Sequence, residues 1–168
     1  MELRDNRART LAVYALLLAA ALILSYIEAL LPPLGIFKLG LANIAVTLGV
    51  YIKSKQCGLV IMLCRVFITS LLFGSATTFA FSLLGGLFAW IIAVLLLPLY
   101  RKEKITLVGV SVLCAASHNV GQVIAACVLL STTAPITMLC WLLLAAIPAG
   151  VLTGIASQII LNRIGDKI

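Results

Sequence analysis

The chain has 168 residues, of which 64% are hydrophobic and only 10% charged, and its mean hydropathy is +1.25. A soluble domain is typically about 45–50% apolar and about 25% charged. This composition therefore excludes a soluble globular protein and indicates an integral membrane protein. The length suits one domain, and no run is long and polar enough to form a second, soluble one.

Six apolar runs follow one another along the chain, and a membrane-crossing helix needs roughly 20 such residues. The predicted helices cover residues 11–31, 39–52, 57–73, 79–97, 107–130 and 136–161. These runs show no period-two alternation and are too long for the roughly ten-residue strands of a membrane barrel. The sequence therefore predicts an all-α, six-helix membrane bundle made by residues 1–168. The second run is too short to cross the membrane upright, so a re-entrant segment is the alternative interpretation for these residues.

Basic residues gather on one side of this six-helix arrangement. Ten of the twelve lie in the terminal segments and in the second and fourth connections: Arg4, Arg7, Arg9, Lys53, Lys55, Arg101, Lys102, Lys104, Arg163 and Lys167. Only Lys38 lies on the other side, and Arg65 falls inside a predicted span. Cytoplasmic loops are rich in lysine and arginine, so both termini are predicted in the cytoplasm. We interpret the net charge of +7 as a topology signal that also attracts anionic lipid, and not as nucleic-acid binding.

Polar side chains inside the apolar runs are the main functional signal. They are Glu28, Asn43, Arg65, His118, Asn119 and Gln122. A charge at mid-bilayer costs about 2.5–3.5 kcal/mol on insertion scales, so Arg65 needs a partner or water, and Glu28 is its only acidic candidate within the spans. His118 and Gln122 are four residues apart and share a helix face, which Asn119 nearly shares.

Two interpretations of these polar residues stay open. One is a polar cavity for a ligand, in which Gly121 lets a ligand or another helix approach closely. The other is interhelical hydrogen bonding, worth about 0.6 kcal/mol per bond in one well-studied bundle. We favour the cavity, because serine or threonine would tie helices together at a lower cost than a charged pair.

The connection LPPLGIFKLG precedes the second predicted helix. Pro32 and Pro33 end the first helix, and Gly40 allows a tight turn. Lys38 is the only charge in this connection. The segment is therefore either a lid over a pocket or a short connector in the membrane interface.

Small residues recur at spacings of four on the first and last predicted helices. The pairs are Ala8–Ala12 and Ala15–Ala19 on the first helix, and the run is Ala146, Gly150 and Gly154 on the last. Such faces let helices approach closely, either inside the bundle or against another protein.

Catalytic and metal-binding motifs are absent from the sequence. It contains no GxxxxGK[ST], HExxH or GxSxG pattern, and its five cysteines form no CxxC pair. The two aspartates, Asp5 and Asp166, lie at the chain ends. The sequence therefore predicts neither an enzyme nor a metal or cofactor site.

Four stretches together resemble a known family: KLGLANI, CRVFITSLLFGS, FSLLGGLFAW and SHNVGQ. They are similar to small bacterial membrane proteins described as Gx transporters or as heptaprenyl diphosphate synthase component I, over roughly residues 8–160. That family in turn resembles the S components of energy-coupling factor transporters. S components are six-helix subunits that bind vitamins or similar small molecules near the outer face. They depend on ATPases and a membrane coupling subunit.

The resemblance implies a substrate-binding subunit of a multi-component importer in the bacterial cytoplasmic membrane. The candidate substrate-binding residues are Glu28, Lys38, Asn43, Arg65, His118, Asn119 and Gln122. Arg65 and Lys38 can hold an anionic group, and residues 32–40 would cover the substrate. Ala15 and Ala19 match the Ala-xxx-Ala face through which S components dock the coupling subunit.

The alternative is a non-catalytic membrane partner in prenyl-lipid, quinone or flavin-linked electron-transfer metabolism. Prenyl synthases hold magnesium and diphosphate with aspartate-rich motifs, which this sequence lacks. Within such a system the chain would therefore be an accessory subunit.

Overall fold

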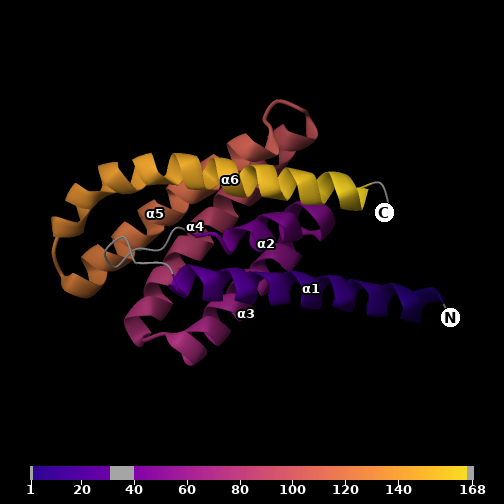
Figure 1. The fold of residues 1–168 in the computed structure, drawn as a ribbon, viewed down its shortest axis with the longest axis horizontal. Coiled ribbons are helices and arrows are strands. Elements are labelled where there is room, and N and C mark those ends of the chain that lie inside the picture. The colour runs from indigo at the N-terminus through magenta and orange to yellow at the C-terminus, as the bar shows by residue number, and fades with distance from the viewer. Residues whose placement is uncertain (1, 31–39, 166–168) are drawn as a thin grey trace.

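Helices make up almost all of the computed structural model, which describes residues 2–30 and 40–165 (Figure 1). For residues 2–7, 73, 164 and 165 it describes the backbone alone. The helices are α1 (Glu2–Leu30), α2 (Asn43–Leu48), α3 (Lys55–Phe73), α4 (Ala76–Arg101), α5 (Leu107–Leu130) and α6 (Leu139–Gly165). A π-helical turn, η1 (Gly49–Lys53), extends α2, and a 3-10 turn, η2 (Ala134–Met138), precedes α6. The predicted all-α fold of six helices is confirmed.

Five helical segments are long and apolar enough to cross a membrane. They cover residues 8–30, 55–72, 76–101, 107–130 and 134–163. The chain is therefore a multi-pass membrane protein. The second predicted helix is the exception, because α2 has 6 residues and η1 has 5. At about 1.5 Å per residue this segment is about 16 Å long, roughly half of a hydrocarbon core of about 30 Å.

Hydroxyl side chains fix where α3 and α4 begin. Ser54 Oγ accepts a hydrogen bond from the Cys57 N–H at 3.1 Å, and Ser75 Oγ accepts one from the Thr78 N–H at 3.2 Å. Such caps satisfy amide groups that the first turn of a helix leaves unpaired. They explain why α3 and α4 begin at residues 55 and 76, ahead of the apolar runs that predicted them.

Glycines bring α4, α5 and α6 into close contact. A Cβ built on Gly121 would lie 2.6 Å from the Leu84 carbonyl oxygen of α4, and one on Gly150 would lie 2.5 Å from Val112 Cα of α5. The sequence predicted that Gly121 lets either a ligand or another helix approach closely. In the structure it is a helix, α4, that lies against Gly121. The small residues of α6 pack inside the bundle, as small faces commonly do.

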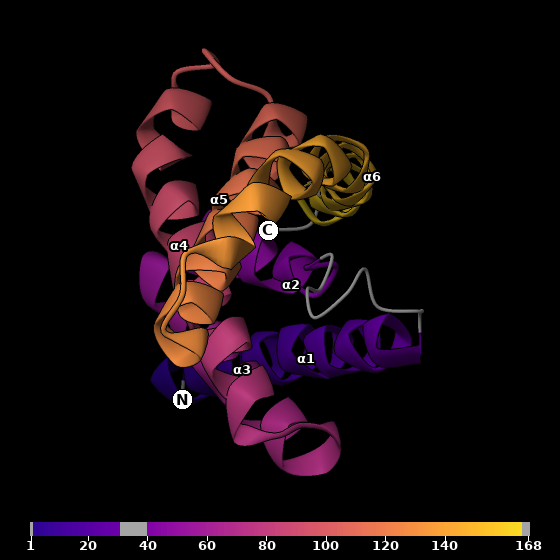
Figure 2. The same cartoon turned by 90° about the vertical axis from the view of Figure 1, so that its left-hand side faces the viewer.

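α2 lies between α1 and α6 and contacts both (Figures 1 and 2). α1 buries Leu17, Ala21 and Glu28 toward the bundle, whereas Ala15 and Ala19 are exposed on its opposite face. α1 begins and α6 ends at the same end of the molecule (Figure 1). This arrangement agrees with two termini on one side of the membrane, and their cytoplasmic location stays a prediction from the charges.

We expect Gly150→Ala to lower the free energy of unfolding by about 1–3 kcal/mol, since the added methyl group meets the α5 backbone and forces the helices apart. The measurement is the unfolding midpoint of the purified protein in detergent. Leu152→Ala, on the exposed side of the same helix at 67% exposure, is the control and should change the midpoint less. Equal midpoints for Gly150→Ala and the native protein would contradict this helix contact.

Candidate functional site

Five buried polar side chains from four helices come together in the bundle, and we call them the polar centre. They are Glu28 of α1, Asn43 of α2, Arg65 of α3, and His118 and Gln122 of α5. None of them is more than 8% exposed. All five were predicted as site residues from the sequence. Lys38, a further predicted member, lies outside the described residues.

The His118 ring occupies space that two glycines leave open. A Cβ built on Gly85 of α4 would lie 2.7 Å from His118 Cε1, and one on Gly40 would lie 3.1 Å from His118 Cδ2. Gln122 lies one turn further along α5, with its Nε2 atom 2.9 Å from Nε2 of His118. The shared face predicted from the four-residue spacing is thus present, and it contacts both α4 and the backbone before α2.

Gly40, three residues before α2, connects the start of that helix to α1 through a hydrogen bond. Its N–H donates a hydrogen bond to the Glu28 carboxylate, and its φ of +77° lies in the region that favours glycine. A Cβ at this position would also lie 2.9 Å from Asn43 Nδ2. A side chain here would therefore strain the backbone and disturb Asn43 and His118 together.

Arg65 reaches the polar centre from α3. A Cβ built on Gly86 of α4 would lie 3.7 Å from Arg65 Nη2, so Arg65 and His118 meet adjacent residues of α4. Glu28 is the acidic side chain whose charge acts on Arg65. Among the described residues, the Nε and Nη2 atoms of Arg65 have no hydrogen-bond partner.

Several buried polar atoms in this region are unpaired within the described part of the chain. They are Nε and Nη2 of Arg65, both carboxamide atoms of Asn43, and Oδ1 of Asn119. Leaving a buried polar group unsatisfied costs about 1–3 kcal/mol. Side chains that only joined helices would pair with one another, so this pattern indicates polar atoms whose partners lie outside the described residues.

Asn119 has a different role from its neighbour His118. Its Nδ2 donates a hydrogen bond of 2.7 Å to the Leu142 carbonyl oxygen of α6. One residue along a helix turns the side-chain direction by about 100°. Asn119 thus ties α5 to α6, although its Oδ1 stays unpaired within the described residues.

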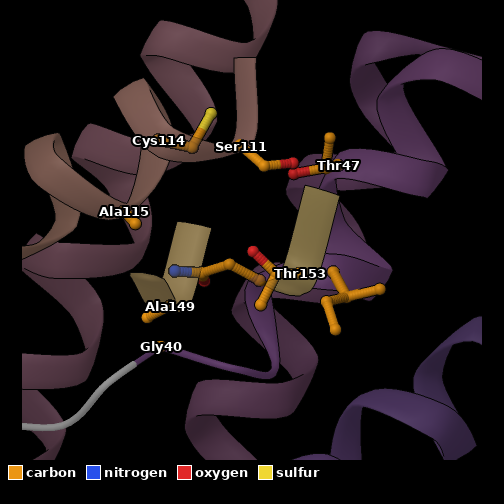
Figure 3. Close-up of a pocket in the computed structure, with 9 residues that line it drawn as sticks. Gly40, Thr47, Ser111, Cys114, Ala115, Ala149 and Thr153 are labelled. Carbon is orange, nitrogen blue, oxygen red and sulfur yellow. The ribbon is translucent and has the colours of Figure 1, made fainter. Parts of the chain in front are cut away.

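A cavity of about 10 Å³ adjoins Asn43 between α2, α5 and α6 (Figure 3). This volume holds about one water molecule. Thr47, Ser111 and Thr153 contribute hydroxyl groups to its wall, and Thr47 and Ser111 point toward one another across it (Figure 3). These hydroxyl side chains were not among the site residues predicted from the sequence. The seven-residue spacing from Ser111 to His118 places both on one face of α5 and would have indicated the first of them.

The remaining reactive side chains form no further centre in the described ranges. All five cysteines are free. Residues 2–30 and 40–165 bring no three His, Cys, Asp or Glu side chains close enough to hold a metal ion. The polar centre offers a ligand a guanidinium, a carboxylate, an imidazole and two carboxamides.

We expect the Glu28→Gln, Arg65→Met double variant to unfold at the native midpoint or above it, with a gain of up to about 1–4 kcal/mol, because apolar replacement of buried charges is often neutral or stabilising. Glutamine keeps an acceptor for the Gly40 N–H. The measurement is the unfolding midpoint in detergent. Asn119→Leu, which removes the bond to α6, should lower that midpoint. A large loss of stability in the double variant would show that the charges hold the helices together.

The comparisons with known proteins agree with the resemblance carried by the sequence motifs. A family model described as heptaprenyl diphosphate synthase component I matches residues 17–160. The match includes every member of the polar centre. No curated protein and no solved structure matches the chain. Because the matched segment is most of its length, the chain belongs to the heptaprenyl diphosphate synthase component I family.

Proposed function

We propose that the chain is the substrate-binding membrane subunit of a multi-component importer for a small molecule such as a vitamin or its precursor. The observation that carries the proposal is the pair Arg65 and Asn43, which are more than nine-tenths buried and keep polar atoms unpaired within the described residues. An ionisable side chain such as Arg65 within a membrane span commonly marks a functional site. Small-molecule sites likewise combine apolar walls with a few placed polar groups.

The outer face of the membrane is the proposed side of entry. The basic residues Lys53, Lys55, Arg101 and Lys102 are exposed in connections that the charge pattern assigns to the cytoplasm. The same pattern assigns the N-terminal end of α1 to the cytoplasm, and Glu28 lies near the C-terminal end of this helix. Substrate would therefore reach the polar centre from outside, through the region where α1 leads toward α2.

Binding requires a movement of the bundle. Pockets for drug-sized ligands measure about 300–1,000 Å³, far more than the cavity of about 10 Å³ beside Asn43. α2 is the element best suited to move, because it crosses only part of the membrane. The hydrogen bond from Gly40 to Glu28 is one contact that such an opening would break.

A partner must supply the energy for import, and α1 offers a surface for it. Ala15 and Ala19 are exposed on the face of α1 that points away from Leu17 and Ala21. Small side chains on an exposed helix allow another membrane helix to approach closely. We therefore assign this face to a coupling subunit, which would bring the ATPases.

We expect Ala15→Leu, Ala19→Leu to reduce co-purification of a coupling subunit and its ATPases at least tenfold, because the larger side chains keep the partner helix at a distance. The measurement is quantitative proteomics of the complex isolated from native membranes. Leu16→Ile, at a neighbouring position that is 70% exposed, should leave recovery unchanged. If the double variant and the Leu16→Ile control recover equal amounts of the coupling subunit, the interface lies elsewhere.

An accessory subunit of lipid or electron-transfer metabolism is the second candidate. The family description, which names a synthase component, and the small size of the cavity favour it. In that role the chain would bind a catalytic partner protein, and the polar centre would hold no small molecule.

We expect a small molecule to be released from the detergent-purified native protein and to be lost from an Arg65→Ala, His118→Ala double variant, because these changes remove two of the ligand-facing groups. The measurement is mass spectrometry of the released compounds. The control is Gln158→Ala, which alters an exposed pair with Asn162 at the far end of α6. If native and variant proteins are equally folded and both release nothing, the accessory role is favoured.

A further inference from the structure

We propose that the substrate carries a carboxylate group, which Arg65 binds side-on through Nε and Nη2. This inference rests on the proposed function. A guanidinium is planar, and the N–H bonds of Nε and Nη2 project in parallel from one of its edges. Such an edge matches the two oxygens of a carboxylate or phosphoryl group. In the described part of the chain, these two nitrogens are the ones that lack hydrogen-bond partners.

Within the described residues, the surroundings of this buried edge of Arg65 are poor in protein acceptors. Gly86 contributes no side chain, and Nη2 lies 3.7 Å from where its Cβ would be. Met62, which is fully buried, packs against the same glycine with its sulfur atom 3.0 Å from that position. The Glu28 carboxylate is engaged by the Gly40 N–H and does not bond to Nε or Nη2.

The charges in the polar centre favour a carboxylate over a phosphate. Among the described residues, Glu28 already opposes the charge of Arg65, so an anionic ligand adds net negative charge to this part of the site. A carboxylate adds one negative charge, whereas a phosphate monoester adds about 1.5 to 2 at pH 7. Uncompensated charge is costly in a medium of low dielectric constant. The ligand with the smaller charge is therefore the better match.

The test compares the compound released from the native protein with that from Arg65→Lys, which keeps the positive charge but has no two-nitrogen edge. We expect the occupancy of the compound to fall about tenfold or more in Arg65→Lys, the usual effect of losing a charge-assisted pair of hydrogen bonds. Arg101→Lys, at the exposed end of α4, is the matched control and should keep native occupancy. Methyl esterification and phosphatase treatment of the released compound distinguish a carboxylate from a phosphate ester.

A compound that forms a methyl ester and is lost from Arg65→Lys supports the inference. A neutral compound, a phosphate ester, or a compound retained fully by Arg65→Lys overturns it while leaving the binding role intact. A folded native protein that releases nothing overturns both. The chemical identity of the native compound decides the matter even where the variant fails to fold.

Discussion

The charge of Arg65 is the constraint on which the arrangement of the polar centre depends. A guanidinium that is 5% exposed within an apolar bundle must be compensated, because hydrocarbon offers it no solvation. α1 brings Glu28 to within range of its charge, and α4 presents Gly86 beside it. Compensation from the described residues is nevertheless incomplete, since two guanidinium nitrogens are unpaired. In the importer subunit that we propose, the substrate would supply the missing hydrogen-bond partners.

We propose that the short second helix is the element that moves when a substrate binds. A helix that crosses the whole membrane is held along its length by neighbours, whereas α2 with η1 is held over about half of that distance. Its N-terminal end is joined through Gly40 to both Glu28 and His118. Movement of α2 would therefore alter the contacts of three helices together. In the proposed role, this movement would enlarge the small cavity beside Asn43 to the space that a substrate needs.

Much of the fold was predictable from the sequence, because hydrophobic length alone determines which segments cross the membrane. Helix ends were less predictable, because caps such as Ser75 extend α4 beyond its apolar run. In the site, the spacing of His118 and Gln122 correctly predicted a shared face. The contacts of that face with Gly40 and Gly85 depend on tertiary packing between segments far apart in the chain. No pattern local to one helix could indicate them.

We infer that the polar centre serves a ligand and not only helix packing. The most direct test of this inference is an experimental structure of the protein isolated gently from its native membrane. We expect a non-protein group within hydrogen-bond distance of Arg65 Nε and Nη2, with α2 displaced to enlarge the cavity beside Asn43. A well-ordered structure in which protein groups bond to both nitrogens, with no additional group beside them, would contradict it.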